Sequence, residues 1–297
     1  MSSVTLHHAV KLDGQGISAS LDALFPWWSI TKSVLAAAVL RLVDQGRVDL
    51  DQRYGDKPYS IRQLLQHTSG LSTYGGAAYH DAVASSDPVW PVEDLLHRVQ
   101  SDRLIFEPGQ GWAYSNVGYL FVRQLIEQQM NLDLNAALSE LVFQPMGLQR
   151  TRIATTPADM ADTYWGNASG YDPRWVYHGL LIGPPSDAVR FLDNLQSGTF
   201  LSERCRAEAM TEYALNESGG GRPWTRTGYG FGLMIGEMGE AGRVCGHTGG
   251  GDASVSALYR FFDIAGAPIV AVFGESTDGA APEWEAVRLA LLAGEAR

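Results

Sequence analysis

The sequence is poor in cysteine. Of its 297 residues only Cys205 and Cys245 are cysteine, and neither lies in a CxxC pair or beside a Cys/His cluster. Isolated thiols of this kind favour buried free cysteines over a disulfide or a metal site. We therefore expect no metal and no cofactor.

Basic residues are also scarce, with 22 Lys and Arg against 33 Asp and Glu and a formal net charge of -11. Nucleic acid or an anionic membrane would need a basic patch that releases counterions, so neither is an expected partner. The small number of lysines, Lys11, Lys32 and Lys57, makes the position of each one informative.

Long apolar runs are absent as well. The best candidate, Val34–Leu40, is soon interrupted by Arg41 and Asp44, well short of the roughly 18 to 20 residues of a membrane span. Residues 1–16 lack a basic segment followed by an apolar stretch, so no signal peptide is expected in the chain as given. The predicted location is the cytoplasm, and the oligomeric state is left open.

What the chain does contain is typical of a soluble folded protein, with 45% apolar and 19% charged residues. Val4–Leu12 alternates loosely like a strand, and Ser29–Gln45 is apolar on most faces and ends at Gly46, which predicts a buried helix. Helical patterns then follow at Ile61–Gln66, Pro91–Arg98, Val117–Gln129, Leu134–Leu141 and Ser186–Leu195.

The pattern changes after the glycine-rich stretch Ser218–Arg222. Strands are predicted at Tyr229–Ile235, Arg243–Gly246, Ser254–Phe261 and Pro268–Phe273, followed by a helix at Pro282–Ala293. The chain therefore begins and ends with strand and helix around a mostly helical insertion. We predict a sheet domain from residues 1–48 plus 222–297 and a helical domain from 49–221, with the active site in the cleft between them.

The first motif with chemical potential is Ser29-Ile30-Thr31-Lys32. Residues at i and i+3 share a helix face, so Lys32 can act as a base for the Ser29 hydroxyl. The helix N-terminus favours developing negative charge there, and burial lowers the pKa of a lysine towards that of a usable base. The alternative is that Ser29 caps the helix and Lys32 reaches solvent.

The second motif, Tyr114-Ser115-Asn116, lies in FEPGQGWAYSNVGYLFVRQLIE, where glycine and proline indicate a turn before a helix. Residues two apart in an extended segment face the same way, so a phenol and a carboxamide can enter one cleft. Tyr114 can relay a proton and Asn116 can bind a substrate amide. The alternative is a simple helix cap beside a packed tyrosine.

The third motif, His247-Thr248-Gly249-Gly250, ends a predicted strand. Its glycines let a ligand backbone come close, and a backbone N–H can point at an oxyanion. The alternative is a glycine turn between strands.

These three motifs, in this order, resemble those of the serine β-lactamase and penicillin-binding-protein superfamily, most closely its class C-like branch. That branch includes class C β-lactamases, D-peptidases and amidases, and family VIII carboxylesterases. The resemblance extends over nearly the whole chain and includes IRQLLQHTSGL (Ile61–Leu71), Phe106–Ile126, VFQPMGLQRT (Val142–Thr151), Gly179–Leu195 and Tyr229–Gly232. It implies an α+β fold with an antiparallel sheet flanked by helices and a helical inserted domain.

The resemblance also implies a role for each motif residue. Ser29 is the acylated nucleophile, Lys32 takes its proton, and Tyr114 relays protons in acylation and deacylation. Substrate is bound by Asn116 and by His247, Thr248 and Gly249, while the backbone N–H groups of Ser29 and Gly250 form the oxyanion hole. Whether Lys32 or Tyr114 is the base stays open, since the two titrations are coupled.

Two neighbouring features have alternative interpretations. His67 and Ser69 in HTSGL invite a catalytic triad with Ser29, but in the family this stretch is a structural turn. Trp27 and Trp28 precede the nucleophile and either wall the acyl pocket or pack in the core, and we favour packing.

The chain departs from the family pattern in two ways. His247 replaces the lysine that attracts the substrate carboxylate in most β-lactamases, and at its ordinary pKa it is mostly neutral at pH 7. Any carboxylate binding by His247 should then weaken between roughly pH 6 and 7.5. The N-terminal region is also short, so the sheet is expected to be smaller than in relatives.

The predicted function is hydrolysis through an acyl-enzyme of a small ester, amide or D-amino-acid peptide. The alternatives are a penicillin-binding or sensory module that acylates with little turnover, a true class C-like β-lactamase, and a homologue with a vestigial site. Loops at Tyr74–Trp90, Tyr164–Tyr177 and Gly219–Trp224 are expected to shape the pocket.

Overall fold

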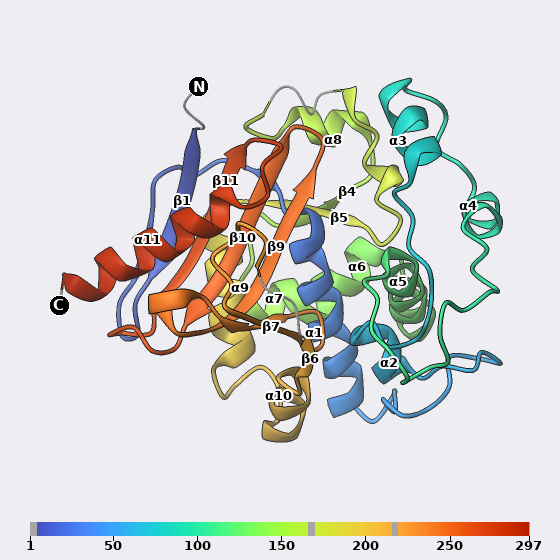
Figure 1. The fold of residues 1–297 in the computed structure, drawn as a ribbon, viewed down its shortest axis with the longest axis horizontal. Coiled ribbons are helices and arrows are strands. Elements are labelled where there is room, and N and C mark those ends of the chain that lie inside the picture. The colour runs from blue at the N-terminus through green and yellow to red at the C-terminus, as the bar shows by residue number, and fades with distance from the viewer. Residues whose placement is uncertain (1–4, 166–169, 216–218, 297) are drawn as a thin grey trace.

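A large antiparallel sheet organises the molecule, for which the computed structural model describes residues 5–165, 170–215 and 219–296 (Figure 1). The strand order is β2-β1-β11-β10-β9-β8-β7-β6, so the first and last strands of the chain are neighbours. The expected α+β class is confirmed. The strands are β1 (Leu6–Lys11), β2 (Ile17–Ala19), β6 (Tyr213–Leu215), β7 (Arg226–Tyr229), β8 (Met234–Glu237), β9 (Arg243–Gly251), β10 (Ser254–Phe261) and β11 (Ile269–Glu275).

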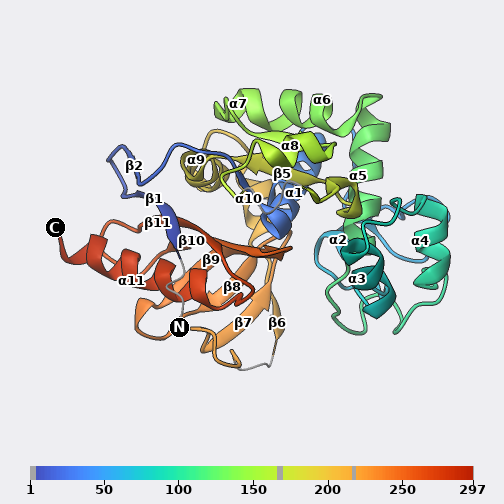
Figure 2. The ribbon, with the colours of Figure 1, turned by 90° about the horizontal axis from the view of Figure 1, so that it is seen from above.

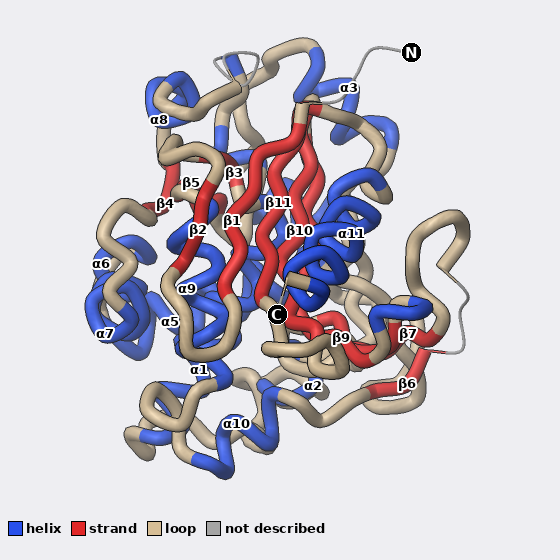
Figure 3. The backbone as a smooth tube through the Cα atoms, turned by 90° about the vertical axis from the view of Figure 1, so that its left-hand side faces the viewer, coloured by secondary structure: helices blue, strands red, loops and turns tan. Residues whose placement is uncertain are grey.

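Helices cover both faces of the sheet. On one face α11 (Ala281–Glu295) packs on β10 and β11, and on the other α9 (Pro185–Gln196) packs on β1 and β11 (Figures 2 and 3). Nearly every side chain of β10 and β11 is therefore buried, as expected for strands covered on both sides. The division into two domains stays a prediction, although α9 and β6 come from the range 49–221 and lie on or in the sheet.

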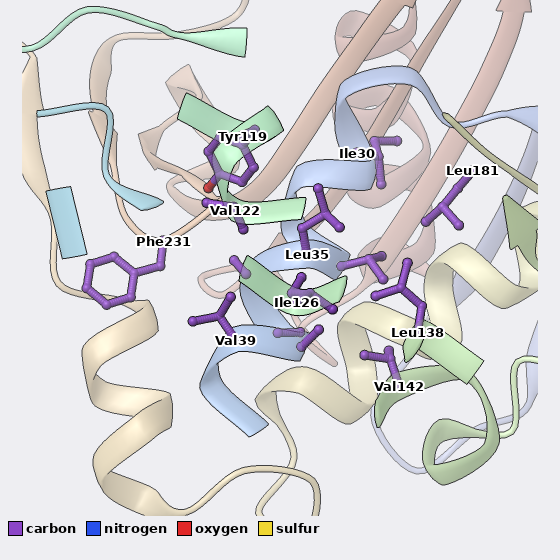
Figure 4. Close-up of a cluster of buried hydrophobic side chains, with 14 of the residues drawn as sticks. Ile30, Leu35, Val39, Tyr119, Val122, Ile126, Leu138, Val142, Leu181 and Phe231 are labelled. Carbon is purple, nitrogen blue, oxygen red and sulfur yellow. The ribbon is translucent and has the colours of Figure 1, made fainter. Parts of the chain in front are cut away.

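The helix predicted at Ser29–Gln45 forms the centre of the structure. It begins as a 3₁₀ turn at Trp28–Ile30 and continues as α1 (Thr31–Asp44), with Gly46 in the left-handed region beyond its end. Every residue of α1 up to Leu40 is buried, because α5 (Asn116–Met130) and α10 (Glu203–Ala209) pack against it (Figure 4). This burial positions the first motif deep in the fold.

The remaining elements form the surroundings of the cleft. A small sheet has the order β3-β5-β4, with β3 (Phe25–Pro26), β4 (Arg152–Ala154) and β5 (Leu180–Gly183). The shorter helices are α2 (Ile61–Leu65), α3 (Ala77–Ala84), α4 (Val92–Arg98), α6 (Leu134–Leu138), α7 (Gln144–Met146) and α8 (Pro157–Ala161). Both cysteines are buried free thiols. No helix in the described part of the chain is long and apolar enough to cross a membrane.

A buried carboxylate ties α11 to the sheet. Glu283 is fully buried and receives hydrogen bonds from Arg222 Nε (2.6 Å), Trp224 Nε1 (3.2 Å) and Tyr259 Oη (2.7 Å). Removing the carboxylate leaves these three donors without their acceptor.

We expect Glu283→Ala to lower the free energy of unfolding by about 3 kcal/mol. This value is at the lower end of the range for breaking a buried ion pair, because the Arg222 side chain is partly exposed to solvent. Urea unfolding measures the loss. The control is Glu285→Ala, whose partner Arg288 is exposed and which should change stability by less than about 0.5 kcal/mol. Equal effects of the two substitutions would contradict a structural role for the buried carboxylate.

Candidate active site

Ser29 of the first motif lines a cleft of about 820 Å³. The 3₁₀ turn that carries Ser29 is fixed to β5 on both sides, since Trp27 N–H donates to Leu181 O (2.8 Å) and Leu181 N–H donates to Thr31 Oγ1 (3.1 Å). Trp28, just before the nucleophile, has a φ of 46°, an unusual conformation for a bulky residue. Tertiary contacts thus hold the nucleophile turn in a strained shape.

The two tryptophans divide between the two expected roles. Trp27 is in the core and its indole donates to Gly183 O (3.1 Å), as the packing interpretation predicts. Trp28 instead lines the cleft and donates to Ser254 Oγ (2.9 Å). A Cβ at Gly249 would lie 2.6 Å from the Trp27 carbonyl oxygen. This glycine of the third motif is therefore required by the close approach of the nucleophile turn.

Lys32 is fully buried, and its Nζ lies 3.1 Å from Ser29 Oγ. Desolvation lowers the pKa of the Lys32 ammonium well below its usual range. The neutral form has a lone pair to accept the Ser29 proton. The alternative in which Lys32 reaches solvent is excluded by its burial.

Tyr114 also contacts the nucleophile, since its phenol hydrogen-bonds to Ser29. Burial raises the pKa of Tyr114, so the neutral phenol is favoured. Lys32 Nζ is 4.9 Å from the centre of the Tyr114 ring. The Ser29 hydroxyl therefore contacts both candidates for the base, an amine and a phenol.

Asn116 begins α5 and lines the same cleft. Its Nδ2 lies 3.5 Å from Tyr74 O, a contact that only the amide nitrogen can donate. Its Oδ1 is buried and has no partner among the described residues. Between the two motif residues, Ser115 caps α5 by accepting from Gly118 N–H (2.9 Å). The capping interpretation therefore applies to Ser115, and Asn116 keeps an unused acceptor.

The HTSGL stretch supports the second motif. His67 Nδ1 accepts a hydrogen bond from Ser115 N–H (3.1 Å), and its ring packs 4.4 Å from that of Tyr114. Its Nε2 has no partner within the described part of the chain, and Ser69 Oγ accepts from Leu71 N–H. These contacts favour the structural turn over a triad with Ser29.

His247 is buried, and both of its ring nitrogens are occupied. Nδ1 faces the Thr248 carbonyl, which can only accept, so Nδ1 carries the proton and Nε2 accepts from Tyr229 Oη (3.0 Å). Burial, and then the Lys32 charge, lower the pKa of His247 to about 3. Binding a carboxylate through this ring would require breaking one of these hydrogen bonds.

This geometry changes the expected pH dependence. Because the lowered pKa of His247, about 3, leaves the ring neutral throughout the range from pH 6 to 7.5, substrate affinity should be flat there rather than falling. The measurement is KM for an ester with a carboxylate in its acyl chain, compared with a neutral ester, across this range. A fall in affinity of the charged ester alone would show that His247 binds the carboxylate.

Thr248 and the glycines complete the third motif on β9. Thr248 Oγ1 donates to Ser256 O (2.8 Å) across the ladder, where Gly250 is paired with Val255. Gly250 lines the cleft together with Ser29, so two backbone segments that were expected to form the oxyanion hole border one space. The oxyanion role itself stays a prediction.

One site residue, His178, was missed by the sequence interpretation, and its partner Tyr74 was expected only as the start of a loop that shapes the pocket. His178 Nε2 is 3.2 Å from Lys32 Nζ, and His178 Nδ1 is 3.2 Å from Tyr74 Oη. Both side chains line the cleft. No spacing rule connects His178 to a lysine 146 positions earlier, so only the fold reveals the contact.

The cleft is lined by aromatic and small residues and carries little charge. Among its described lining residues there is no lysine or arginine, and Asp252 is the one acidic side chain. Two of the three predicted loops, Tyr74–Trp90 and Tyr164–Tyr177, contribute walls. Residues 166–169 of the second loop lie outside the described residues, as does Ser218, which precedes the third loop, Gly219–Trp224. The described part of the chain contains no group of three or more potential metal ligands. The described wall residues from these two loops are Tyr74, Gly75, Tyr79, His80, Val83, Ala84, Ser86, Gly170, Tyr171 and Val176.

Comparison with known proteins extends this description. A family model described as Beta-lactamase matches residues 4–289. Penicillin-binding protein 4* of Bacillus subtilis is 26% identical over 276 residues, which are 82% of this chain and 59% of that protein. Esterase EstB of Burkholderia gladioli is 34% identical over 149 residues, 43% of this chain and 38% of that protein. The chain thus spans well under two thirds of the length of these curated relatives.

A solved structure agrees on the fold. The D-amino acid amidase of Ochrobactrum anthropi SV3, complexed with D-phenylalanine, matches with a TM-score of 0.79 at 22% identity, covering 98% of this chain and 94% of that one. The resemblance expected from the three motifs is confirmed, including the class C-like branch. Because the family model covers nearly the whole length, this chain belongs to the beta-lactamase family.

Proposed function

We propose that the protein is a serine hydrolase that works through an acyl-enzyme on Ser29. The observation that carries this proposal is the pair of contacts at the Ser29 hydroxyl, with the buried amine of Lys32 at 3.1 Å and with the phenol of Tyr114. A hydroxyl becomes a useful nucleophile when a base lies within hydrogen-bond reach. Because Ser29, Lys32 and Tyr114 are all present and in contact, a vestigial site is disfavoured.

In the proposed acylation, Ser29 Oγ attacks the acyl carbon while its proton passes to Lys32, directly or through Tyr114. The carbonyl oxygen becomes an oxyanion, which the N–H groups of Ser29 and Gly250 stabilise. The bond to the leaving alcohol or amine then breaks, and that group takes the transferred proton. In deacylation a water gives a proton to the same relay and attacks the acyl carbon. The bond between that carbon and Ser29 Oγ then breaks, Oγ takes the proton back, and the acid is released.

The proposed substrates are small esters, amides or D-amino-acid peptides. The related proteins named as esterase, penicillin-binding protein and D-amino acid amidase support this range. The cleft carries no lysine or arginine among its described lining residues, and both nitrogens of His247 are engaged. These features favour substrates without a carboxylate over penicillins and cephalosporins. The acidic net charge supports the absence of nucleic-acid and membrane partners, and a cytoplasmic location stays a prediction.

The test is a panel of p-nitrophenyl acetate and butyrate, D-alanyl peptides, D-amino acid amides and nitrocefin, followed by intact-protein mass spectrometry. We expect turnover of the ester or amide substrates and a transient adduct on Ser29. Turnover of nitrocefin near the diffusional ceiling would instead identify a β-lactamase. A stable β-lactam adduct without turnover of any substrate would identify the penicillin-binding alternative, which the relation to penicillin-binding protein 4* supports.

Asp252 provides a prediction about substrate charge. Its exposed carboxylate borders the cleft. In a water-filled site, the repulsion between this charge and a substrate carboxylate a few ångströms away is about 1 kcal/mol. We expect Asp252→Asn to raise kcat/KM for p-nitrophenyl hydrogen succinate about fivefold and to leave p-nitrophenyl butyrate within twofold. The difference should shrink at high salt. Equal changes with both esters would indicate that the carboxylate acts on the fold rather than on substrate charge.

A further inference from the structure

His178 lies at an unusual position for a histidine, because it contacts the catalytic lysine and the cleft at once. It is 3% exposed, and it lies two residues before β5, the strand that holds the nucleophile turn. The following residue, Gly179, has a φ of 98°, and a Cβ there would approach Leu134 Cδ2 to 2.7 Å. The turn that directs His178 towards Lys32 is therefore specified by the glycine.

The side chains form one hydrogen-bonded chain behind the nucleophile. Ser29 Oγ is 3.1 Å from Lys32 Nζ, which is 3.2 Å from His178 Nε2. His178 Nδ1 is 3.2 Å from Tyr74 Oη, and this oxygen also accepts from Tyr177 N–H at 3.0 Å. Each link is within hydrogen-bond range.

Only one arrangement of protons in this chain leaves Lys32 able to act as a base. If His178 Nε2 carried the proton, it would donate to the lone pair of neutral Lys32 and occupy the site that must receive the Ser29 proton. If Nδ1 carries the proton, it donates to Tyr74 Oη, and Nε2 accepts an N–H from Lys32. The lone pair of Lys32 then faces Ser29.

The electrostatic surroundings keep the His178 ring neutral. Burial lowers the pKa of His178 well below its usual range, and the neighbouring charges lower it further. The groups that act on the ring are Lys32, Arg123, His247 and His67, and none of them is a carboxylate. A neutral ring with Nε2 as acceptor is therefore compatible with a positively charged lysine during the reaction.

We propose that His178, held by Tyr74, is a positioning residue for acylation, which accepts an N–H from Lys32 and thereby aims the lone pair of the amine at Ser29 Oγ. The proposal rests on the proposed function, since it refines the proton transfer from Ser29. His178 itself neither gains nor loses a proton. It acts through Lys32, and Tyr74 holds the ring in place through the hydrogen bond at Nδ1.

The test is kcat/KM for p-nitrophenyl butyrate, whose good leaving group needs no proton, so that the rate reports deprotonation of Ser29. We expect His178→Ala to lower kcat/KM about 100-fold, because a misdirected base loses much of its effect. His178→Gln, whose amide oxygen can accept from Lys32, should lie within about tenfold of the wild type. Added imidazole should raise the rate of His178→Ala in a saturable manner.

Tyr74→Phe removes only the hydroxyl and should lower kcat/KM about fivefold. The matched controls are His97→Ala, on the exposed face of α4, and Tyr54→Phe, whose hydroxyl contacts Gln124 away from the cleft. Both controls should stay within twofold of the wild type, and imidazole should not affect them. If His178→Ala does not fold, His178→Gln and Tyr74→Phe, with their folding checked by circular dichroism, decide the question.

The proposal is overturned if kcat/KM of His178→Ala stays within threefold of the wild type. It is also overturned if added imidazole does not raise kcat/KM of His178→Ala and His178→Gln is as slow as His178→Ala. The second result would mean that His178 only shapes the cleft. Ser29→Ala in the same assay separates this proposal from the proposed function. Wild-type hydrolysis that depends on Ser29 but not on His178 removes only the positioning role, whereas hydrolysis independent of Ser29 removes both.

Discussion

Ser29→Ala is expected to lower kcat for p-nitrophenyl butyrate by about 10⁴- to 10⁶-fold, the range for loss of a serine nucleophile. The substitution removes the only hydroxyl that contacts both Lys32 and Tyr114 among the described residues. The backbone of the nucleophile turn stays fixed by the hydrogen bonds of Trp27 and Thr31 to β5, so the fold should persist. Steady-state kinetics and intact-protein mass spectrometry, in which the acyl adduct should disappear, measure the effect.

The matched control is Ser139→Ala, which removes a serine hydroxyl outside the cleft whose partner is Gln144. Its kcat should stay within twofold of the wild type. Melting temperatures of both variants show whether any loss of activity arises from unfolding. Residual hydrolysis by Ser29→Ala at a tenth of the wild-type rate or more would mean that another residue attacks the substrate.

Elements with strong periodicity could be predicted from the sequence. The expected strand Ser254–Phe261 coincides with β10, and the helix expected at Val117–Gln129 differs from α5 by one residue at each end. The strand expected at Arg243–Gly246 ends too early, because β9 continues to Gly251 through glycines that normally interrupt a strand. Here Gly249 and Gly251 are needed because Trp27 and Trp28 pack against them.

Short strands could not be predicted, because their stability comes from partners distant in sequence. The expected strand Tyr229–Ile235 is in fact the end of β7, a bend and the start of β8. The small sheet of β3, β4 and β5 was missed entirely, although β5 holds the nucleophile turn. Its strands have two to four residues, too few to show alternation.

In the candidate site, too, local contacts could be predicted from the sequence and distant ones could not. Ser29 and Lys32 are neighbours on one turn, so their contact follows from spacing, and motif resemblance adds Tyr114. Burial was not predictable, and it decides the charge states: it favours the neutral amine of Lys32 and the neutral ring of His247. His178 joins the site only because β5 brings residue 178 to residue 32.

Burial also gives Lys32 opposite effects on activity and stability. Its amine has no ion-pair partner among the described residues, and desolvation disfavours its charged form. The folded pKa lies below the unfolded value of 10.5, so the unfolded chain binds more protons between these two values. The folded state therefore loses stability as the pH falls from 10.5 towards the folded pKa.

Lys32→Met keeps the length of the side chain and removes the base. We expect kcat/KM for p-nitrophenyl butyrate to fall about 10³- to 10⁴-fold, the contribution of a positioned general base. At pH 7 the free energy of unfolding should rise by about 1–2 kcal/mol, because a buried amine is replaced by an apolar group. The gain should shrink as the pH approaches 10.5, where the unfolded lysine also loses its charge.

Urea unfolding at pH 7 and pH 10, together with steady-state kinetics, measures both effects on the same protein. Lys32→Arg is the informative comparison, since guanidinium keeps its charge at every accessible pH and should be both inactive and destabilised. A Lys32→Met protein that is inactive but no more stable than the wild type at either pH would mean that the amine is solvated and charged in the folded state. Lys32 could not then act as the neutral base, and Tyr114, whose phenol also contacts Ser29, would have to take the proton.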